Sequence, residues 1–427
     1  MSLWRAAELP TRVVAPAGAV RPAADGDASS GVPVRWGMAL VLVSTTLFAR
    51  FGVNFGSYSL DFSLIALYAL LALLLLLRRS AIDGTVAVLY IGGMLVASAS
   101  LLVNSGLGAS DESSPSSLLL LFALYLPLVV TMPLAKGSRD RAWVIESFGV
   151  IAMICALAGI AQYFAQFAIK QPWLFDFTPW VPEVLRGPSH YNTVIEVGSL
   201  HKSNGFFLRE PSGFSFVVAL AAIIELNTAR RWARIALFVF ALLVSYSGTG
   251  VLALIIGLMF PLSRKSALRL LIAIIVALLV FGVLGEVLNL SFTASRVAEF
   301  GSERSSAYIR YIAPLRVVMG NLDNTPWSAL LGHGPGTITR IQHSVESFDP
   351  TWAKVFFEYG ALGFVAFMSL ILLALHRSGA ASPLKAVLFT SWLVMGGHLL
   401  SPENVATLYV LAAAWRPPTS TKVMERT

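Results

Sequence analysis

The chain carries little charge for its length. Charged residues make up 13% of its 427 positions and hydrophobic residues 56%, whereas an average soluble domain has about 25% charged residues. A soluble chain of this length would form two or three domains, and so few charges would not cover their surfaces. We therefore exclude a soluble multidomain protein and expect a polytopic membrane protein.

Cysteine and histidine are also scarce. The single cysteine, Cys155, excludes an intrachain disulfide framework and a cysteine-based zinc site. His333 and His343 lie in one long loop, but two histidines are too few to predict a metal centre. The glycine-rich turn Leu331–Thr337 lacks the Lys-Ser/Thr ending of a phosphate-binding P-loop. We therefore expect neither a metal nor a cofactor.

Long apolar segments dominate the rest of the chain. A membrane-crossing helix needs about 20 mainly apolar residues, with a range of roughly 17–25. Twelve segments approach this length, although the seventh, eighth and twelfth are short. The sequence thus predicts an all-α fold, a polytopic bundle of about 12 transmembrane helices with two long, partly helical periplasmic loops. The segments are Val34–Ala49, Tyr58–Leu77, Thr85–Val103, Ser117–Leu134, Trp143–Ile169, Ser212–Leu226, Ile235–Ser245, Thr249–Leu262, Ala267–Leu288, Ala353–Leu375, Leu384–Leu400 and Val405–Trp415.

Basic residues predict the orientation of these segments. The formal net charge is +8, and clusters of lysine and arginine fall in alternate connections and in both tails. The short connections on the other side, 104–116, 246–248 and 401–404, contain no lysine or arginine. Because basic connections stay on the cytosolic side, this pattern predicts that both termini are cytosolic. Topology then explains most of the positive charge, and we expect no nucleic-acid partner.

Composition divides the chain into three parts. Residues 1–33 are polar and rich in alanine, proline and glycine, which predicts a disordered cytosolic tail. Residues 34–415 form the transmembrane domain, and residues 416–427 form a second cytosolic tail. The domain includes two periplasmic loops, 170–211 and 289–352, whose tryptophans suit the membrane interface and predict ordered loops.

The first loop ends in a charged segment. Lys202, Arg209 and Glu210 precede Pro211 and Ser212, which suit the start of a helix. The free N–H groups of a helix start attract anions, and the two basic residues lie beside it. From the residues alone, two interpretations stay open: a basic pair that reaches the interface beside an ordinary cap, or an anion-binding site.

The second loop contains arginines on a predicted helix. We expect a helix over Ser302–Met319 that Pro314 kinks or divides. Either this helix lies on the membrane with its arginines over lipid headgroups, or the guanidinium groups of Arg304 and Arg310 bind a phosphate or pyrophosphate. The glycine-rich turn with His333 follows, and its glycines allow a tight backbone turn.

These features together resemble the O-antigen polymerase and O-antigen ligase superfamily. The resemblance covers roughly 170–363 and rests on the order and spacing of several motifs rather than on any single one. The motifs are the two long loops, a basic residue before Gly-Phe-Phe that leads into Glu210-Pro211-Ser212, the arginine-bearing helix, the Gly-x-Gly-x-Gly turn, and Glu358-x-Gly360-x-x-Gly363.

The resemblance implies an inverting, metal-independent integral-membrane glycosyltransferase of the bacterial inner membrane. Its donor would be a glycan on undecaprenyl pyrophosphate, used at the periplasmic face, and membrane lipid and a chain-length regulator are further expected partners. A polymerase transfers the glycan to a sugar hydroxyl of another repeat unit, whereas a ligase transfers it to lipid A-core. Asp349-Pro350 stands where ligases carry His-Asn, which favours the polymerase. A transporter or flippase of lipid-linked sugars is the alternative from another class.

The resemblance also suggests roles for individual residues. The family's first-loop arginine corresponds to Lys202, and its second-loop arginine corresponds to Arg310, with Arg304 as the nearest alternative. Cations stabilise the charge that develops on a leaving pyrophosphate, and a carboxylate or imidazole deprotonates the acceptor. The expected pyrophosphate or substrate ligands are Lys202, Arg209, Arg304 and His333, and the expected catalytic residues are Arg310, Glu210 as first choice of base, and His343 as second.

Overall fold

The computed structural model describes most of the chain outside its two tails. Two of the expected site residues, Arg304 and His343, lie outside the described residues, as do nearly all positions of the tails. The described ranges are 31–55, 59–106, 112–133, 139–169, 171–187, 193–284, 305–322, 327–340, 347–395 and 399–416.

The fold is mostly helical, and each of the twelve expected apolar segments overlaps a helix. Three helices end in a turn of another type: a 3₁₀ turn at Leu126–Val129 follows α4, and π-helical turns at Ser391–Met395 and Tyr409–Ala413 follow α15 and α16. The helices are α1 Val32–Thr46, α2 Phe62–Leu76, α3 Gly84–Gly106, α4 Pro115–Tyr125, α5 Arg139–Ala165, α6 Pro211–Asn227, α7 Trp232–Val244, α8 Gly248–Met259, α9 Arg264–Leu284, α14 Thr351–His376, α15 Ser382–Thr390 and α16 Pro402–Leu408.

The described parts of the long loops contain short elements. The first loop has 3₁₀ turns at Pro172–Leu174, Thr178–Trp180 and Glu183–Leu185, then a hairpin of β5 Glu196–Val197 and β6 Leu200–His201. The second loop has α11 Ser306–Tyr311, α12 Ala313–Gly320 and α13 Ser328–Leu331. The predicted helix over 302–319 is thus divided at Ile312, immediately before the proline-containing start of α12.

Short strands join the helices at both ends of the molecule. An antiparallel pair, β1 Gly52–Asn54 and β2 Ser59–Asp61, follows α1. At the other end, β4 Val130–Pro133 pairs with β3 Ala81–Ile82 and with β7 Trp415–Arg416.

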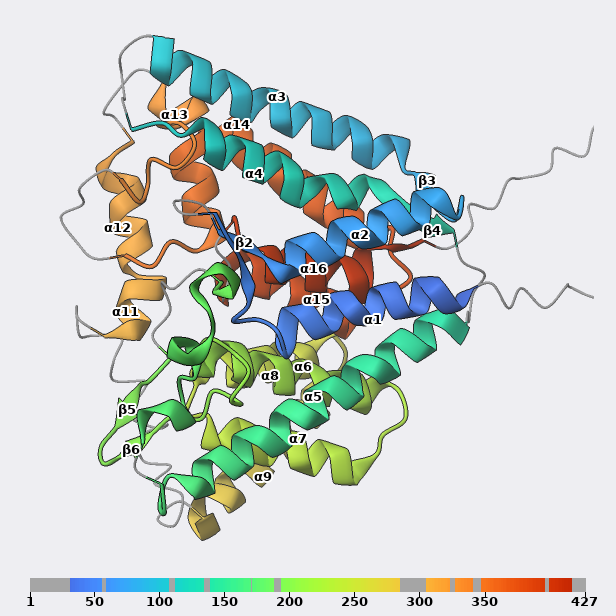
Figure 1. The fold of residues 1–427 in the computed structure, drawn as a ribbon, viewed down its shortest axis with the longest axis vertical. Coiled ribbons are helices and arrows are strands. Elements are labelled where there is room, and N and C mark those ends of the chain that lie inside the picture. Colours follow the sequence, from blue (N-terminus) through green and yellow to red (C-terminus); the bar gives the residue numbers. More distant parts are fainter. Residues whose placement is uncertain are drawn as a thin grey trace, which may run out of the picture.

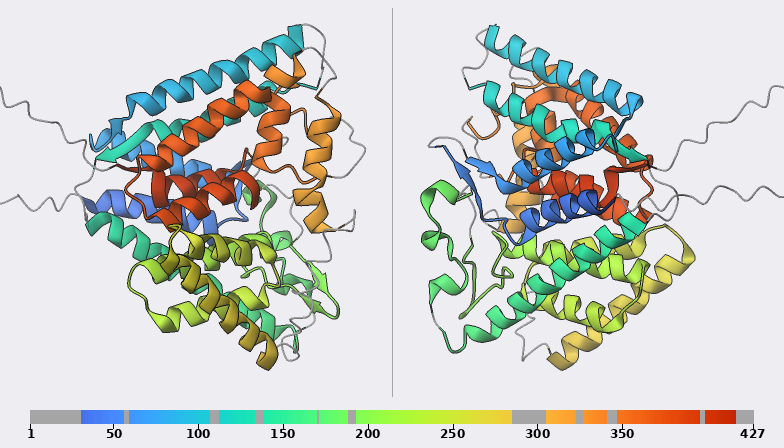
Figure 2. Two further views of the ribbon diagram at one scale, coloured as in Figure 1. Left: turned by 180° about the vertical axis from the view of Figure 1, so that it is seen from behind. Right: turned by 45° about the vertical axis from the view of Figure 1, so that its right-hand side comes forward.

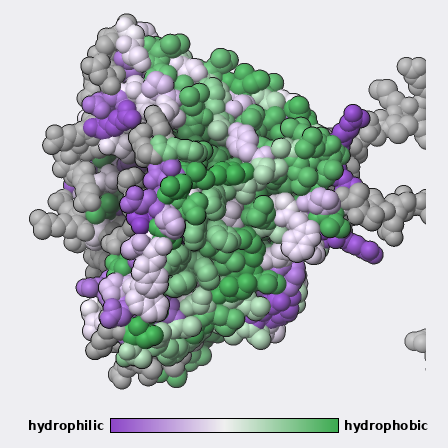
Figure 3. Space-filling model, in the orientation of Figure 1, coloured by the Kyte–Doolittle hydropathy of each residue, from purple (hydrophilic) through white to green (hydrophobic). Residues whose placement is uncertain are grey.

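The molecule has the surface of a membrane protein. Figure 3 shows hydrophobic residues over the middle of one face and hydrophilic residues toward its two ends. Among the described residues, α3, α5 and α14 are long and apolar enough to cross a membrane, and several other helices are apolar but shorter. The structure therefore agrees with the predicted helical membrane protein. The number of membrane crossings stays a prediction.

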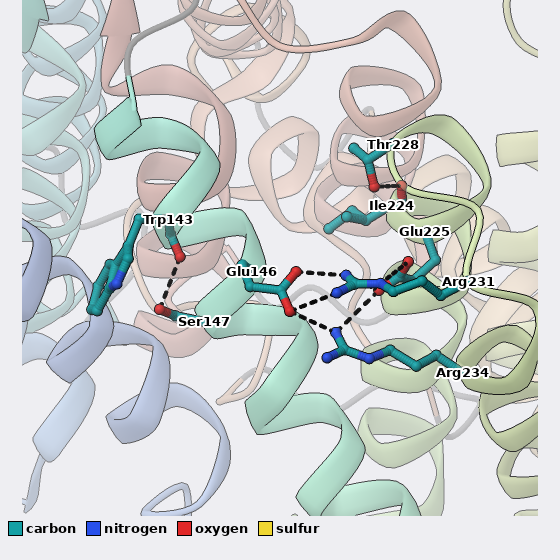
Figure 4. Close-up of polar contacts among 8 residues, drawn as sticks. All are labelled: Trp143, Glu146, Ser147, Ile224, Glu225, Thr228, Arg231 and Arg234. Carbon is teal, nitrogen blue, oxygen red and sulfur yellow. Dashed lines mark hydrogen bonds and ion pairs between the residues drawn. The ribbon is translucent and has the colours of Figure 1, made fainter.

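The two long loops share one end of the molecule. Figure 1 shows β5, β6, α11 and α12 at the left and β3 and β4 at the right, and Figure 2 shows the same separation from two other sides. The end with β3 and β4 also holds an ion-pair cluster, in which Arg231 and Arg234 of α7 bind Glu146 of α5 and Glu225 of α6 (Figure 4). This cluster joins three helices where basic connections were expected.

Helix α6 lies at the centre of the bundle. All of its residues from Phe214 to Glu225 are buried, which is typical of a helix at the centre of a bundle. Gly250 of α8 has no side chain, so its backbone approaches α6 closely, and its N–H donates to the Ser215 hydroxyl at 3.1 Å. This contact fixes the first turn of α6, where the charged segment of the first loop ends.

Helix α14 is broken, which differs from the continuous apolar segment expected over 353–375. Gly360 has a φ of 64°, and a Cβ atom there would collide with the backbone of Leu330. The break frees two carbonyl groups, and the glycine-rich turn bonds to them: the N–H groups of His333 and Gly334 donate to Phe357 O and Glu358 O at 2.9 and 3.0 Å. The close fit of the two backbones is the physical reason for the break.

Candidate functional site

A cavity of about 100 Å³ opens at the loop end of the bundle. Its walls come from the ends of α1, α6 and α8, from the π-helical turn after α15, from the start of α16 and from the second loop. Three residues expected to act together, Arg209, Glu210 and Arg310, line it. The cavity therefore brings charged residues of both loops to one place.

Glu210 and Arg310 face each other in this cavity. Glu210 precedes the first turn of α6, and its Oε2 atom accepts a hydrogen bond of 2.8 Å from the Ser212 hydroxyl. The Nη2 atom of Arg310, from the last turn of α11, lies 3.5 Å from the same oxygen. The Arg310 guanidinium also lies 4.8 Å from the ring centroid of Phe348, which lines the cavity. The first-loop carboxylate and the second-loop cation thus form one pair.

Arg209 lines the cavity but is held by several protein groups. Its Nη1 atom lies 3.0 Å from Glu403 of α16, its Nη2 atom binds Asp61 of β2, and its Nε atom donates to the Ala49 carbonyl. The side chains of Arg209 and Asp61 are both buried. Sequence reasoning missed Glu403, because no motif relates the last apolar segment to the first loop.

Arg50 holds the segment immediately before these residues. Its Nε and Nη2 atoms donate to Leu208 O at 3.1 and 2.8 Å, and its Nη1 atom lies 3.1 Å from Asp176 of the first loop. Burial lowers the pKa of Arg50 to about 10, with Asp176 opposing and Arg209 adding to this effect, so the guanidinium stays charged at neutral pH. These contacts give Arg50, immediately after the first apolar segment, a structural role in positioning the first loop.

Lys202 lies outside the residues that line the cavity. Its side chain is buried, and its N–H donates to Ile195 O at 2.8 Å. The next two residues form a buried network with Gln162 of α5: Ser203 donates to Gln162 Oε1 at 2.8 Å, and Gln162 Nε2 donates to Asn204 Oδ1 at 2.9 Å. This network fixes the Lys202 segment against the bundle.

His333 is also placed away from the cavity lining. Its Nε2 atom lies 2.9 Å from Asn321 O, and its ring centroid lies 4.6 Å from that of Phe357. The residue is buried within the turn that packs on α14. Among the residues that the structure describes, no group of three or more metal-binding side chains comes together.

Comparison with known families identifies one family. The family model of WcaD colanic acid polymerase matches residues 38–417, a range that contains every residue lining the cavity. The chain belongs to the WcaD colanic acid polymerase family. The WcaD family is one of polysaccharide polymerases, which agrees with the resemblance to the O-antigen polymerase superfamily and indicates a glycosyltransferase-type membrane enzyme. No curated protein matches the chain.

Proposed function

We propose that the chain polymerises lipid-linked polysaccharide repeat units at the periplasmic face of the bacterial inner membrane. It would transfer a glycan from undecaprenyl pyrophosphate to a sugar hydroxyl of another repeat unit, as in the assembly of an exopolysaccharide or O-antigen. Membership of the WcaD family supports the polymerase class. The observation that carries the site is the pairing of Arg310 with Glu210 inside the cavity.

The proposed reaction has two chemical requirements. The bond between the anomeric carbon and the pyrophosphate oxygen breaks while the acceptor oxygen forms a new bond on the opposite face, which inverts the configuration. Arg310 stabilises the charge that grows on the departing pyrophosphate, since a guanidinium offers paired N–H donors to phosphate oxygens. Its position against Phe348 restricts the side chain before substrate binds.

The second requirement is a base for the acceptor hydroxyl. In this proposal the proton passes to Glu210, whose Oε2 atom is directed by Ser212 and Arg310. His343 stays the second candidate. Glu210 leaves the reaction protonated, undecaprenyl pyrophosphate leaves as the anion, and release of the proton to water restores the site.

The other basic residues of the two loops have different roles in this proposal. Arg209 stays a pyrophosphate candidate because it lines the cavity, although Asp61 and Glu403 hold much of its guanidinium. Lys202 and His333 are buried outside the lining, so we propose that they order the two loops. No metal is needed, because the arginines supply the positive charge.

The experiment is a polymerisation assay with purified protein and lipid-linked repeat units, read as a ladder of products. Arg310→Ala and Glu210→Gln should each reduce the ladder by at least about a hundredfold, the effect of losing a group that acts in the transition state. Arg316→Ala, in the neighbouring α12, is the matched control, because Arg316 is exposed and outside the lining. Full ladders from both Arg310→Ala and Glu210→Gln would refute the site. Metal independence would be refuted if EDTA abolished transfer and added Mg²⁺ or Mn²⁺ restored it.

A further inference from the structure

Three buried residues with hydroxyl side chains line the part of the cavity formed by the helical bundle. Thr249 lies in the first turn of α8, Ser391 begins the π-helical turn after α15, and Ser401 precedes α16. Their exposed fractions are only 5%, 4% and 6%. Within the described part of the chain, none of these hydroxyls forms a hydrogen bond.

Hydroxyl groups of buried residues usually have hydrogen-bond partners. An unsatisfied polar group in an interior costs free energy, so native proteins pair nearly all of them with protein groups, water or ligand. Thr45, on the same cavity, shows the usual solution, because its hydroxyl donates to Leu42 O at 3.0 Å. The hydroxyls of Thr249, Ser391 and Ser401 instead remain available to whatever fills the cavity.

The backbone around Ser391 points to the same place. A π-helical turn is rare and frequently occurs at functional sites. Here the first and last residues of the turn, Ser391 and Met395, both line the cavity. The side chain of the next residue, Trp392, is buried in the core instead, where its Nε1 atom donates to the Tyr125 hydroxyl at 2.7 Å. This anchor holds Ser391 at the cavity wall.

The cavity therefore has two chemically different walls. The loop wall carries Arg310, whose guanidinium suits an anionic pyrophosphate, and Glu210, the proposed base, pairs with it. The bundle wall carries neutral hydroxyls, which both donate and accept hydrogen bonds and so match sugar hydroxyl groups. Because inversion places the incoming oxygen opposite the leaving oxygen, the pyrophosphate and the acceptor hydroxyl must lie on opposite sides of the donor's anomeric carbon.

We infer that Thr249, Ser391 and Ser401 form the acceptor-sugar subsite. This inference rests on the proposed polymerase function and specifies which wall binds which substrate. The hydroxyls hold the acceptor sugar so that one of its O–H groups faces the anomeric carbon of the donor. The new glycosidic bond then forms at that oxygen, and its proton leaves to the base described above.

Binding of the acceptor alone tests the inference without requiring turnover. The probe is the repeat-unit oligosaccharide of the strain that carries this chain, released from its lipid by mild acid and titrated into purified protein. The double variant Ser391→Ala/Ser401→Ala should bind it about tenfold more weakly than wild type, the effect of losing two hydrogen bonds. Arg310→Ala should bind it as wild type does, because Arg310 belongs to the other wall.

The matched control is Ser44→Ala. Ser44 is a buried serine of α1 that lies outside the cavity lining and donates to Val41 O at 2.7 Å, so this variant should leave oligosaccharide binding unchanged. Equal binding by wild type and the double variant would overturn the subsite, as would a wild type that does not bind the probe. Loss of binding in Arg310→Ala alone would overturn the assignment of the two walls. Failure of the proposed function would appear separately, as absence of a product ladder.

Discussion

Arg209 of the first loop joins Asp61 and Glu403, two carboxylates near opposite ends of the chain. Its Nη1 atom lies 3.0 Å from Glu403, and its Nη2 atom binds Asp61. The start of α2, the end of the first loop and the start of α16 are therefore held by one guanidinium. Glu210 follows directly, so the position of this carboxylate in the cavity depends on the same contacts.

Arg209→Met should destabilise the protein strongly. Removing one partner from a buried ion pair costs about 3–5 kcal/mol, because the charges that remain are unpaired. Asp61→Asn in the same chain should recover part of the loss, since it removes one of the two carboxylates left facing each other. Thermal unfolding in detergent measures both effects. Equal stability of Arg209→Met and Arg209→Met/Asp61→Asn would show that Asp61 and Glu403 do not repel each other when Arg209 is absent.

Arg50→Met should loosen the first loop. This variant removes the hydrogen bonds to Leu208 and Phe175 and the ion pair with Asp176, and buried carbonyl groups then lose their donors. We expect faster proteolysis within the first loop and reduced polymer formation. Arg186→Lys is the control, because Arg186 also bonds to loop carbonyls but is less buried than Arg50. Equal proteolysis of wild type and Arg50→Met would contradict the role of Arg50.

Asp349 predicts a pH dependence of stability. Burial raises the pKa of Asp349 to about 6, against the opposing charge of Lys354 and with the added repulsion of Glu358. The folded-state pKa is thus above the unfolded value of 3.8. The contribution of Asp349 to the free energy of unfolding is therefore complete below pH 3.8 and is lost as pH rises through about 6. Asp349→Asn should therefore be more stable than wild type at pH 7, by up to about 3 kcal/mol. The difference should shrink toward pH 4 in unfolding measured across this range, and a constant difference would contradict the prediction.

Gly360→Ala should destabilise the contact between α14 and the glycine-rich turn. The φ of 64° disfavours any side chain, and the added Cβ atom would meet the Leu330 backbone. We expect a loss of several kcal/mol, seen as a lower Tm in detergent. Gly92→Ala is the control, because a Cβ atom there meets nothing within 4 Å. A similar Tm for Gly360→Ala and Gly92→Ala would show that the turn does not require the break.

Local patterns predicted the helices and part of the site, whereas long-range contacts did not follow from them. Pro211 and Ser212 indicated the start of α6, so Glu210 was expected beside a helix N-terminus, and the structure places it there. The assignment of Glu210 and Arg310 to one site depended on a family resemblance, because 100 residues separate them, and their direct pairing was not predicted. Glu403 had no such signal. Backbone packing between two glycine-containing segments, which broke α14 at Gly360, also leaves no periodic trace in the sequence.

Phe348 should support Arg310 in transfer. The guanidinium lies 4.8 Å from the Phe348 ring centroid, and such a contact contributes about 0.5–2 kcal/mol and restricts the side chain. Phe348→Leu keeps an apolar residue but removes the aromatic face, so we expect several-fold slower polymerisation at saturating donor. In an Arg310→Ala background the same substitution should have little further effect, because the cation that the ring positions is gone. Rates of ladder formation for the four proteins of this cycle give the coupling. An equal loss in both backgrounds would mean that Phe348 acts on the substrate independently of Arg310.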